Sequence, residues 1–202
     1  GGMTMAAFFT TWLQFTVLLT PFFVLSMFLS MTIGWPESDR RRLAIRIGVA
    51  SFAASIILFY FGNWIFHVFG ITVDAFRIGG GALLFLTAVG LVQGDHQSSK
   101  PRPIESSDIA VVPLAIPITV GPGTTGALLV IGAQTTDVNL RLITTASLIA
   151  AIAGLTGILL LGSFLERVLR LRGITIISKL TGLFLSAMAA EMLFTGIRSF
   201  FK

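Results

Sequence analysis

The strongest constraint on the fold is a cluster of helix-breaking residues inside an apolar segment. The segment covers residues 109–133 and is long enough to cross a bilayer as a helix. Yet residues 113–126, PLAIPITVGPGTTG, contain three prolines and three glycines, and each proline removes a backbone donor and clashes with the preceding turn. Irregular backbone at membrane depth is tolerated only where protein or water satisfies its polar groups, so we expect this segment to line a cavity.

Five further apolar runs accompany this segment. Hydrophobic residues make up 54% of the chain and charged residues only 11%, whereas about 25% of a soluble domain is charged. The six runs cover residues 8–33, 43–66, 75–92, 109–133, 142–165 and 174–197. The first run is too long, and has too few basic residues before it, for a removable signal peptide. The sequence therefore predicts an all-α, multi-pass membrane protein with six transmembrane helices.

A polar segment, residues 95–108, divides the chain into two similar halves, residues 3–94 and 109–202. We exclude Gly1 and Gly2, which resemble a remnant of tag removal. Each half carries Gly-Ile-Thr before its third span, at residues 70–72 and 173–175, and proline inside its first span. Because each half has three spans, an odd number, the second half crosses the membrane in the opposite direction to the first. We therefore expect two inverted-topology three-helix repeats, with discontinuous first and fourth helices.

The distribution of basic residues predicts the orientation. The first, third and fifth loops together hold ten of the 14 Lys and Arg residues. Lys and Arg are enriched in cytoplasmic loops, so both termini are expected outside. The predicted location is the cytoplasmic (inner) membrane of a prokaryote.

The two proline-containing spans supply the candidate substrate site. Thr20 and Pro21 suit the N-cap and first position of a half-helix, and a second half-helix can begin after the break at Pro122. Helix N-termini bind anions such as carboxylates, and in an inverted repeat two of them meet near the midplane. The alternative is that these residues only kink helices for packing. The candidate substrate-binding residues are Thr20, Pro21, Pro117, Gly121, Pro122, Gly123, Thr124 and Thr125.

Two charged residues near or inside the spans need a partner or a function. Glu191 lies well inside the sixth run and is a candidate proton carrier; alternatively it is solvated near the interface or pairs with Arg198. Arg77 is expected to pair with Asp74 or to reach the interface.

Small residues inside the spans predict close helix packing. The residues concerned are Gly79, Gly80, Gly81, Gly90, Gly154 and Gly157.

Sequence motifs of enzymes are missing from the chain. It contains no cysteine, no His-Glu-x-x-His, no Gly-x-Ser-x-Gly and no P-loop lysine. We therefore expect no catalytic residues, no metal and no cofactor.

Several of these stretches resemble the MarC family of bacterial and archaeal membrane proteins, which includes the SnatA-type neutral amino-acid transporters. The resemblance covers essentially the whole chain. It rests on VPLAIP at residues 112–117 followed by GPG at 121–123, FGITVDAFRIGG at 69–80, RGIT at 172–175 with Gly182, and ESDRRR at 37–42.

This resemblance implies a fold and a function. The implied fold is two inverted three-helix repeats around a central site. The implied function is secondary transport of small neutral amino acids such as glycine and alanine, driven by a gradient of H⁺ or Na⁺. The first span departs from the family pattern, because Phe23, Val24 and Ser26 replace the expected Gly, Asn and Pro. The alternatives are a non-transporting scaffold or a stress-response protein without its own substrate, and a channel, which the scarcity of intramembrane polar residues disfavours. No nucleic acid is expected as a partner.

Overall fold

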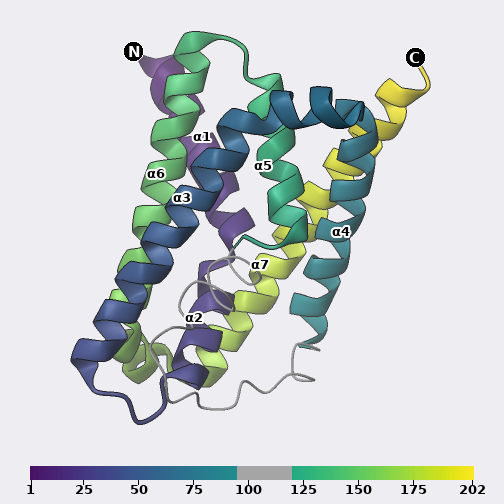
Figure 1. Cartoon of the computed structure of the whole chain (residues 1–202). Helices are drawn as coiled ribbons and strands as arrows, with labels where there is room; N and C mark the ends of the chain where they lie inside the picture. The colour runs from purple at the N-terminus through teal and green to yellow at the C-terminus, as the bar shows by residue number, and fades with distance from the viewer. Residues whose placement is uncertain (95–119) are drawn as a thin grey trace.

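The computed structural model describes residues 1–94 and 120–202, and these residues form α-helices without strands (Figure 1). Residues 95–108 and Pro117 lie outside the described residues, as does the first part of the predicted fourth span. The helices are α1 (Gly2–Leu19), α2 (Pro21–Met31), α3 (Glu37–Phe69), α4 (Val73–Gln93), α5 (Pro122–Gln134), α6 (Val138–Leu160) and α7 (Gly162–Phe200).

Five helical stretches are long and apolar enough to cross a membrane. They are Gly2–Met31, which joins α1 and α2, and helices α3, α4, α6 and α7. These stretches match five of the six predicted runs, so the prediction of an all-α multi-pass membrane protein is confirmed. The remaining run, the fourth, is represented by α5, whose 13 residues reach only about 20 Å at 1.5 Å per residue.

The helix boundaries differ from the apolar runs in two places. Helix α3 begins at Glu37 rather than at residue 43, because helical hydrogen bonding continues through the charged stretch beyond the apolar run. Helix α6 ends at Leu160, and residues 162–165 belong to α7. Hydropathy alone did not show this turn, since Leu161 and the residues around it are apolar.

The two Gly-Ile-Thr elements occupy different local structures. In the first, Gly70 ends α3 in the left-handed conformation (φ 62°), and the Thr72 hydroxyl accepts a hydrogen bond from the N–H of Ala75 at 3.1 Å. These are a C-terminal glycine and an N-cap. The second element lies within α7, where the backbone instead departs from helix at Arg170 (φ 56°, ψ 168°). The backbone therefore departs from helix shortly before the last span of each half. In the first half it does so at the glycine of the Gly-Ile-Thr element, and in the second half at Arg170, before that element begins.

Glycines bring α4 and α7 into close contact along their length. An ideal Cβ on Gly81 would lie 3.1 Å from the carbonyl oxygen of Ala189, and one on Gly182 would lie 3.1 Å from that of Ala88. The prediction of packing is therefore confirmed for Gly81. It is wrong for Gly79, Gly154 and Gly157, which face open space, because helical spacing alone does not say which face meets a neighbour.

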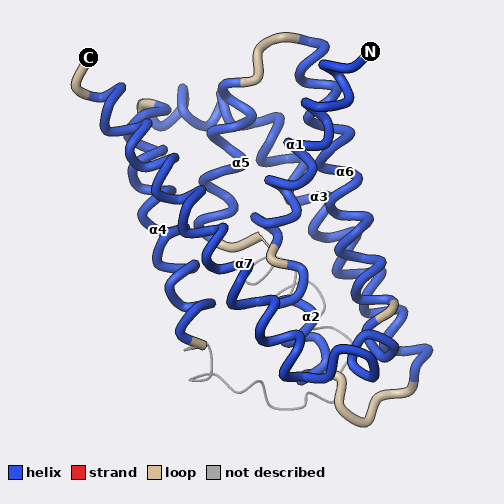
Figure 2. The backbone as a smooth tube through the Cα atoms, turned by 180° about the vertical axis from the view of Figure 1, so that it is seen from behind, coloured by secondary structure: helices blue, strands red, loops and turns tan. Residues whose placement is uncertain are grey.

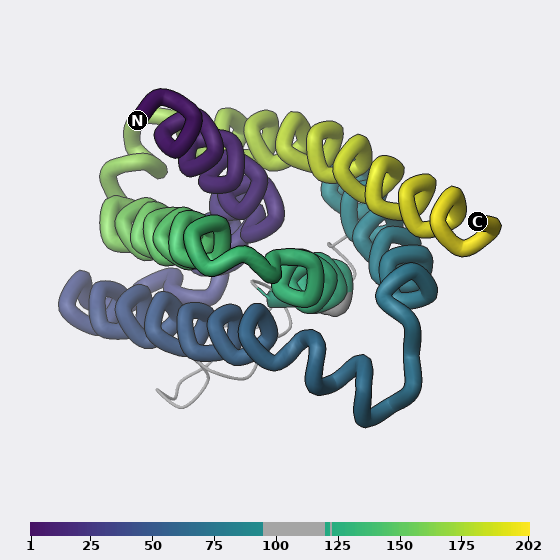
Figure 3. Tube along the Cα trace, turned by 90° about the horizontal axis from the view of Figure 1, so that it is seen from above, coloured from purple at the N-terminus to yellow at the C-terminus, as the bar shows by residue number. Residues whose placement is uncertain are grey.

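Helix α5 lies in the middle of the bundle. Seen from above, the other helices surround it (Figure 3), and it packs on both α3 and α4. Four consecutive residues, 127–130, are buried. Gly126 meets Gly80 of α4, while Gly132 meets the backbone of Phe59 in α3. A short helix enclosed on all sides has no wide polar face, and α5 accordingly carries no charged residue.

The chain termini lie at one end of the bundle and the α2–α3 loop lies at the other (Figures 1 and 2). The loop side also holds the beginning of α7. The basic residues 40–42 of α3 and Arg167 of α7 are thus at the end opposite the termini, as the loop pattern predicts.

Candidate functional site

The junction of α1 and α2 is a strained break. Thr20 has φ 47° and ψ 58°, the left-handed conformation, which is rare for a β-branched residue. Its N–H donates to the carbonyl of Val17 at 3.1 Å, and its own carbonyl accepts from Val24 at 3.0 Å. Pro21 follows at the first position of α2 and has no N–H to continue the ladder of α1.

Thr20 does not act as the side-chain cap that its residue type suggests. It stands at the N-cap position of α2, but its hydroxyl makes no capping hydrogen bond. An N-cap side chain reaches the backbone from an extended conformation, whereas Thr20 is left-handed. Helix α2 begins at Pro21, and the predicted capping mechanism is wrong.

A second helix begins at Pro122. Gly121 is the N-cap in an extended conformation (φ −75°, ψ −179°), and its carbonyl accepts from the N–H of Thr125 at 2.8 Å. Pro122 occupies the first helical position, where a missing N–H costs no hydrogen bond. The start of α5 is therefore one residue earlier than the predicted Gly123.

The start of α5 lies against the end of α1. The buried Thr124 hydroxyl of α5 donates to the carbonyl of Leu18, in the last turn of α1, at 3.1 Å. Val120 belongs to the same hydrophobic cluster as Leu18 and Leu19. Figures 1 and 2 show the α1–α2 junction and the start of α5 about midway between the ends of the bundle. Residues 106 positions apart in sequence thus meet in the interior.

Partial charges of opposite sign meet at this junction. The N-termini of α2 and α5 each carry a partial positive charge, from N–H groups that have no helical partner. The C-terminus of α1 carries a partial negative charge from its last carbonyls, and one of these carbonyls is the acceptor for Thr124. Positive and negative helix ends therefore lie side by side at the junction.

The predicted site residues divide into two groups. Thr20, Pro21, Gly121, Pro122, Thr124 and Thr125 surround the junction. Gly123 instead faces α4, since an ideal Cβ there would lie 2.7 Å from the Cα of Leu84. Glu191 is exposed on α7, and no ion pair joins it to Arg198 within the described residues. Arg77 does pair with Asp74, at 3.1 Å.

Sequence reasoning missed two residues of the buried interior. Ser51 and Ser55 of α3 are 0% exposed, and neither hydroxyl has a hydrogen-bond partner among the described residues. Two serines four residues apart in an apolar run are a detectable signal, but serine is common in membrane helices and the spacing alone does not distinguish a site from packing.

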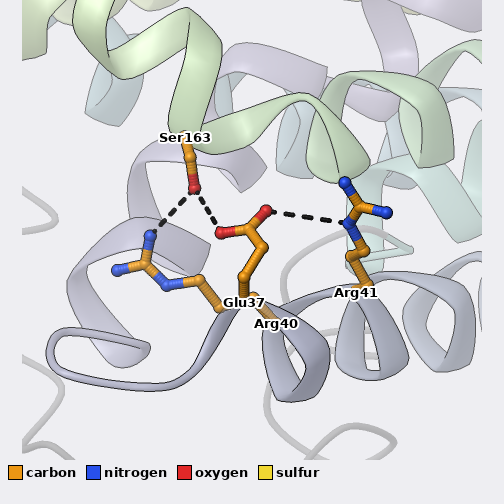
Figure 4. A network of polar contacts seen from close by, with 4 residues as sticks. All are labelled: Glu37, Arg40, Arg41 and Ser163. Atoms are coloured by element: carbon orange, nitrogen blue, oxygen red, sulfur yellow. Dashed lines mark hydrogen bonds and ion pairs between the residues drawn. The ribbon is translucent and has the colours of Figure 1, made fainter.

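A polar network lies at the end of the bundle that holds the α2–α3 loop (Figure 4). Arg40 donates to the carbonyl of Thr32 from Nε and Nη2, at 3.1 and 3.0 Å, and from Nη1 to the hydroxyl of Ser163 at 3.2 Å. The Ser163 hydroxyl in turn donates to Glu37 at 2.9 Å, and Glu37 lies 3.8 Å from Arg41. This network ties the start of α3 to the start of α7.

The membrane-length helices and the buried, neutral junction define an integral multi-pass membrane protein. The family model described as "MarC family integral membrane protein" matches residues 5–201. The chain therefore belongs to the MarC family of integral membrane proteins, and the resemblance in its motifs is confirmed.

Relatives occur in archaea and in bacteria. The chain is 34% identical to the UPF0056 membrane protein MJ1677 of Methanocaldococcus jannaschii, over 90% of this chain and 91% of the relative. It is 29% identical to YhcE of Escherichia coli, over 96% and 93% of the two chains. It is 30% identical to YvbG of Bacillus subtilis, over 87% and 86%. The comparison with solved structures found no match.

Proposed function

We propose that this protein is a secondary transporter for a small neutral amino acid. The observation that carries the proposal is the contact of Thr124 with the carbonyl of Leu18, because it joins the start of α5 to the end of α1, from opposite halves of the chain, in the buried interior. Helix breaks at membrane depth are characteristic of transporter binding sites. The resemblance to SnatA-type transporters supports the same substrate class.

The helix packing supports an inverted repeat. The first span packs on the last two, through α1 with α6 and α2 with α7. In the second half, α5 packs on α3 and α4, the last two spans of the first half. The third and sixth spans also pack on each other. If each span of the first half is exchanged with the corresponding span of the second half, the same pairs of neighbouring spans result. A pseudo-two-fold axis that relates the two halves requires this symmetry.

The junction suits a zwitterion. We infer that the N-termini of α2 and α5 hold the substrate carboxylate and that carbonyls near the end of α1 face the ammonium group. Pro117 and Thr125 complete the proposed lining. The side chains of Phe22, Phe23 and Val120 flank the helix starts and restrict the substrate to a short side chain.

Alternating access follows from the same arrangement. One repeat rocks against the other around the junction and exposes it to either side of the membrane in turn. The basic loops are proposed to face the cytoplasm and both termini the outside of a prokaryotic inner membrane. An H⁺ or Na⁺ gradient drives transport. No enzymatic activity and no nucleic-acid partner belong to this proposal.

Uptake into proteoliposomes tests the proposal. The purified protein is reconstituted, and uptake of labelled glycine and L-alanine is measured with and without an inward H⁺ or Na⁺ gradient. Saturable, gradient-dependent uptake is expected and identifies the coupling ion. Correctly inserted protein that takes up neither amino acid refutes this substrate class and favours the scaffold alternative.

A further inference from the structure

Two buried hydroxyls of α3 break a pattern that other helical hydroxyls follow. Many Ser and Thr side chains in this protein donate to the carbonyl four residues earlier; examples are Thr16, Thr144 and Thr181. Ser51 and Ser55 make no such bond, although both are completely buried. An unpartnered buried hydroxyl destabilises the fold, so a native protein retains one for a reason.

Both serines point toward the interior of the bundle. Residues 48, 51, 55, 59 and 62 repeat at helical spacing and share one face of α3. At one end of this face Gly48 meets Thr156 of α6, and at the other Gly62 meets the backbone of Leu129 in α5. Ser51 and Ser55 lie between these contacts, on the face of α3 that packs on α5 and α6.

The depth of these serines matches the first turns of α5. The hydroxyl of Ser147 donates to the carbonyl of Phe8, which fixes α6 against α1 at that level. Thr156 follows Ser147 by nine residues along α6, and Val17 follows Phe8 by nine residues along α1. At about 1.5 Å per residue, Thr156 is therefore level with Val17, roughly one turn before the break at Thr20. Gly48 meets Thr156, and Ser51 and Ser55 follow Gly48 by about one and two turns in the direction that α5 takes from the junction.

We propose that Ser51 and Ser55 are substrate-binding residues that accept hydrogen bonds from the amino group of the transported molecule. This inference rests on the proposed function. The helix N-termini already offer donors for a carboxylate, whereas an ammonium group carries three donors and needs acceptors in addition to the carbonyls near the end of α1. Two hydroxyl oxygens one turn apart on a buried helix face provide such acceptors without a buried charge. The bound amino group then donates hydrogen bonds to the two serine hydroxyls, which have no partner without substrate.

The test measures thermal unfolding of Ser51→Ala and Ser55→Ala in detergent, with and without glycine or L-alanine. Because each substitution removes an unpartnered hydroxyl, the melting temperature without amino acid is expected to stay the same or rise. The stabilisation by glycine or L-alanine is expected to fall, with at least about a tenfold loss of affinity for each variant.

Ser178→Ala is the matched control. Ser178 is also buried and its hydroxyl is also unpartnered, but it lies on α7, one turn before the contact of Gly182 with α4. This variant is expected to keep the full response to glycine and L-alanine.

Two results would overturn the inference: a lower melting temperature of the Ser51 and Ser55 variants without amino acid, or an undiminished response to the amino acids. If the wild type responds to neither amino acid, the proposed substrate class fails. In that case no amino group is bound for the two hydroxyls to accept from, and the inference fails together with the substrate class.

Discussion

Replacing Thr124 by valine tests whether one hydrogen bond holds the start of α5 against the end of α1. The side chains have nearly the same shape, so the change removes the hydroxyl and little volume. The Thr124 hydroxyl and the Leu18 carbonyl lie 3.1 Å apart in a buried setting, with Thr124 7% exposed. Leaving a buried carbonyl without its donor costs about 1–3 kcal/mol of unfolding free energy.

This loss of unfolding free energy corresponds to a measurable drop in the melting temperature. For a chain of this size, 1 kcal/mol lowers the melting temperature by about 2–4 °C, so Thr124→Val is expected to lower it by roughly 2–12 °C. Thr125→Val is the matched control, because Thr125 is the next residue, is only partly buried, and its side chain makes no hydrogen bond within the described residues. We expect its melting temperature to change by less than about 2 °C.

Thermal unfolding in detergent, followed by the fluorescence of the tryptophans, measures both variants. Equal melting temperatures for Thr124→Val and Thr125→Val would refute the argument that the hydroxyl joins the breaks. A loss of amino-acid uptake in Thr124→Val at temperatures where it is fully folded would show, in addition, that the joined arrangement is needed for transport.

Three further predictions test separate parts of the structure. Gly123→Ala places a Cβ 2.7 Å from the Cα of Leu84 and should cost about 1–3 kcal/mol by overpacking, whereas Gly154→Ala meets no atom within 4 Å and should be neutral or stabilising in the same unfolding assay. Thr20→Gly relieves the left-handed strain and should raise stability by about 1 kcal/mol; a lower melting temperature would show that the Thr20 side chain has a packing role. Glu191→Gln should leave gradient-driven uptake intact, because Glu191 is exposed, and abolished uptake with normal folding would establish it as the proton carrier.

The apolar runs were sufficient to predict the class of the protein and most of its spans. Hydropathy reports transfer of a whole segment into the bilayer, which is a local property of composition and length. It did not report where helices end within apolar sequence, as the turn at Leu161 shows. The predicted division of the chain at residues 95–108 and the role of Pro117 stay predictions, since both lie outside the described residues.

The sequence by itself predicted that helices are interrupted or kinked at Pro21 and Pro122, because proline lacks the donor that a continuous helix requires. It also showed the small residues that permit close packing, without their partners. Only the tertiary structure decided that Thr124 reaches Leu18, that Gly123 faces α4, and that Ser51 and Ser55 are buried without a partner. These facts depend on which faces of distant helices meet, and such contacts arise from packing the whole bundle at once.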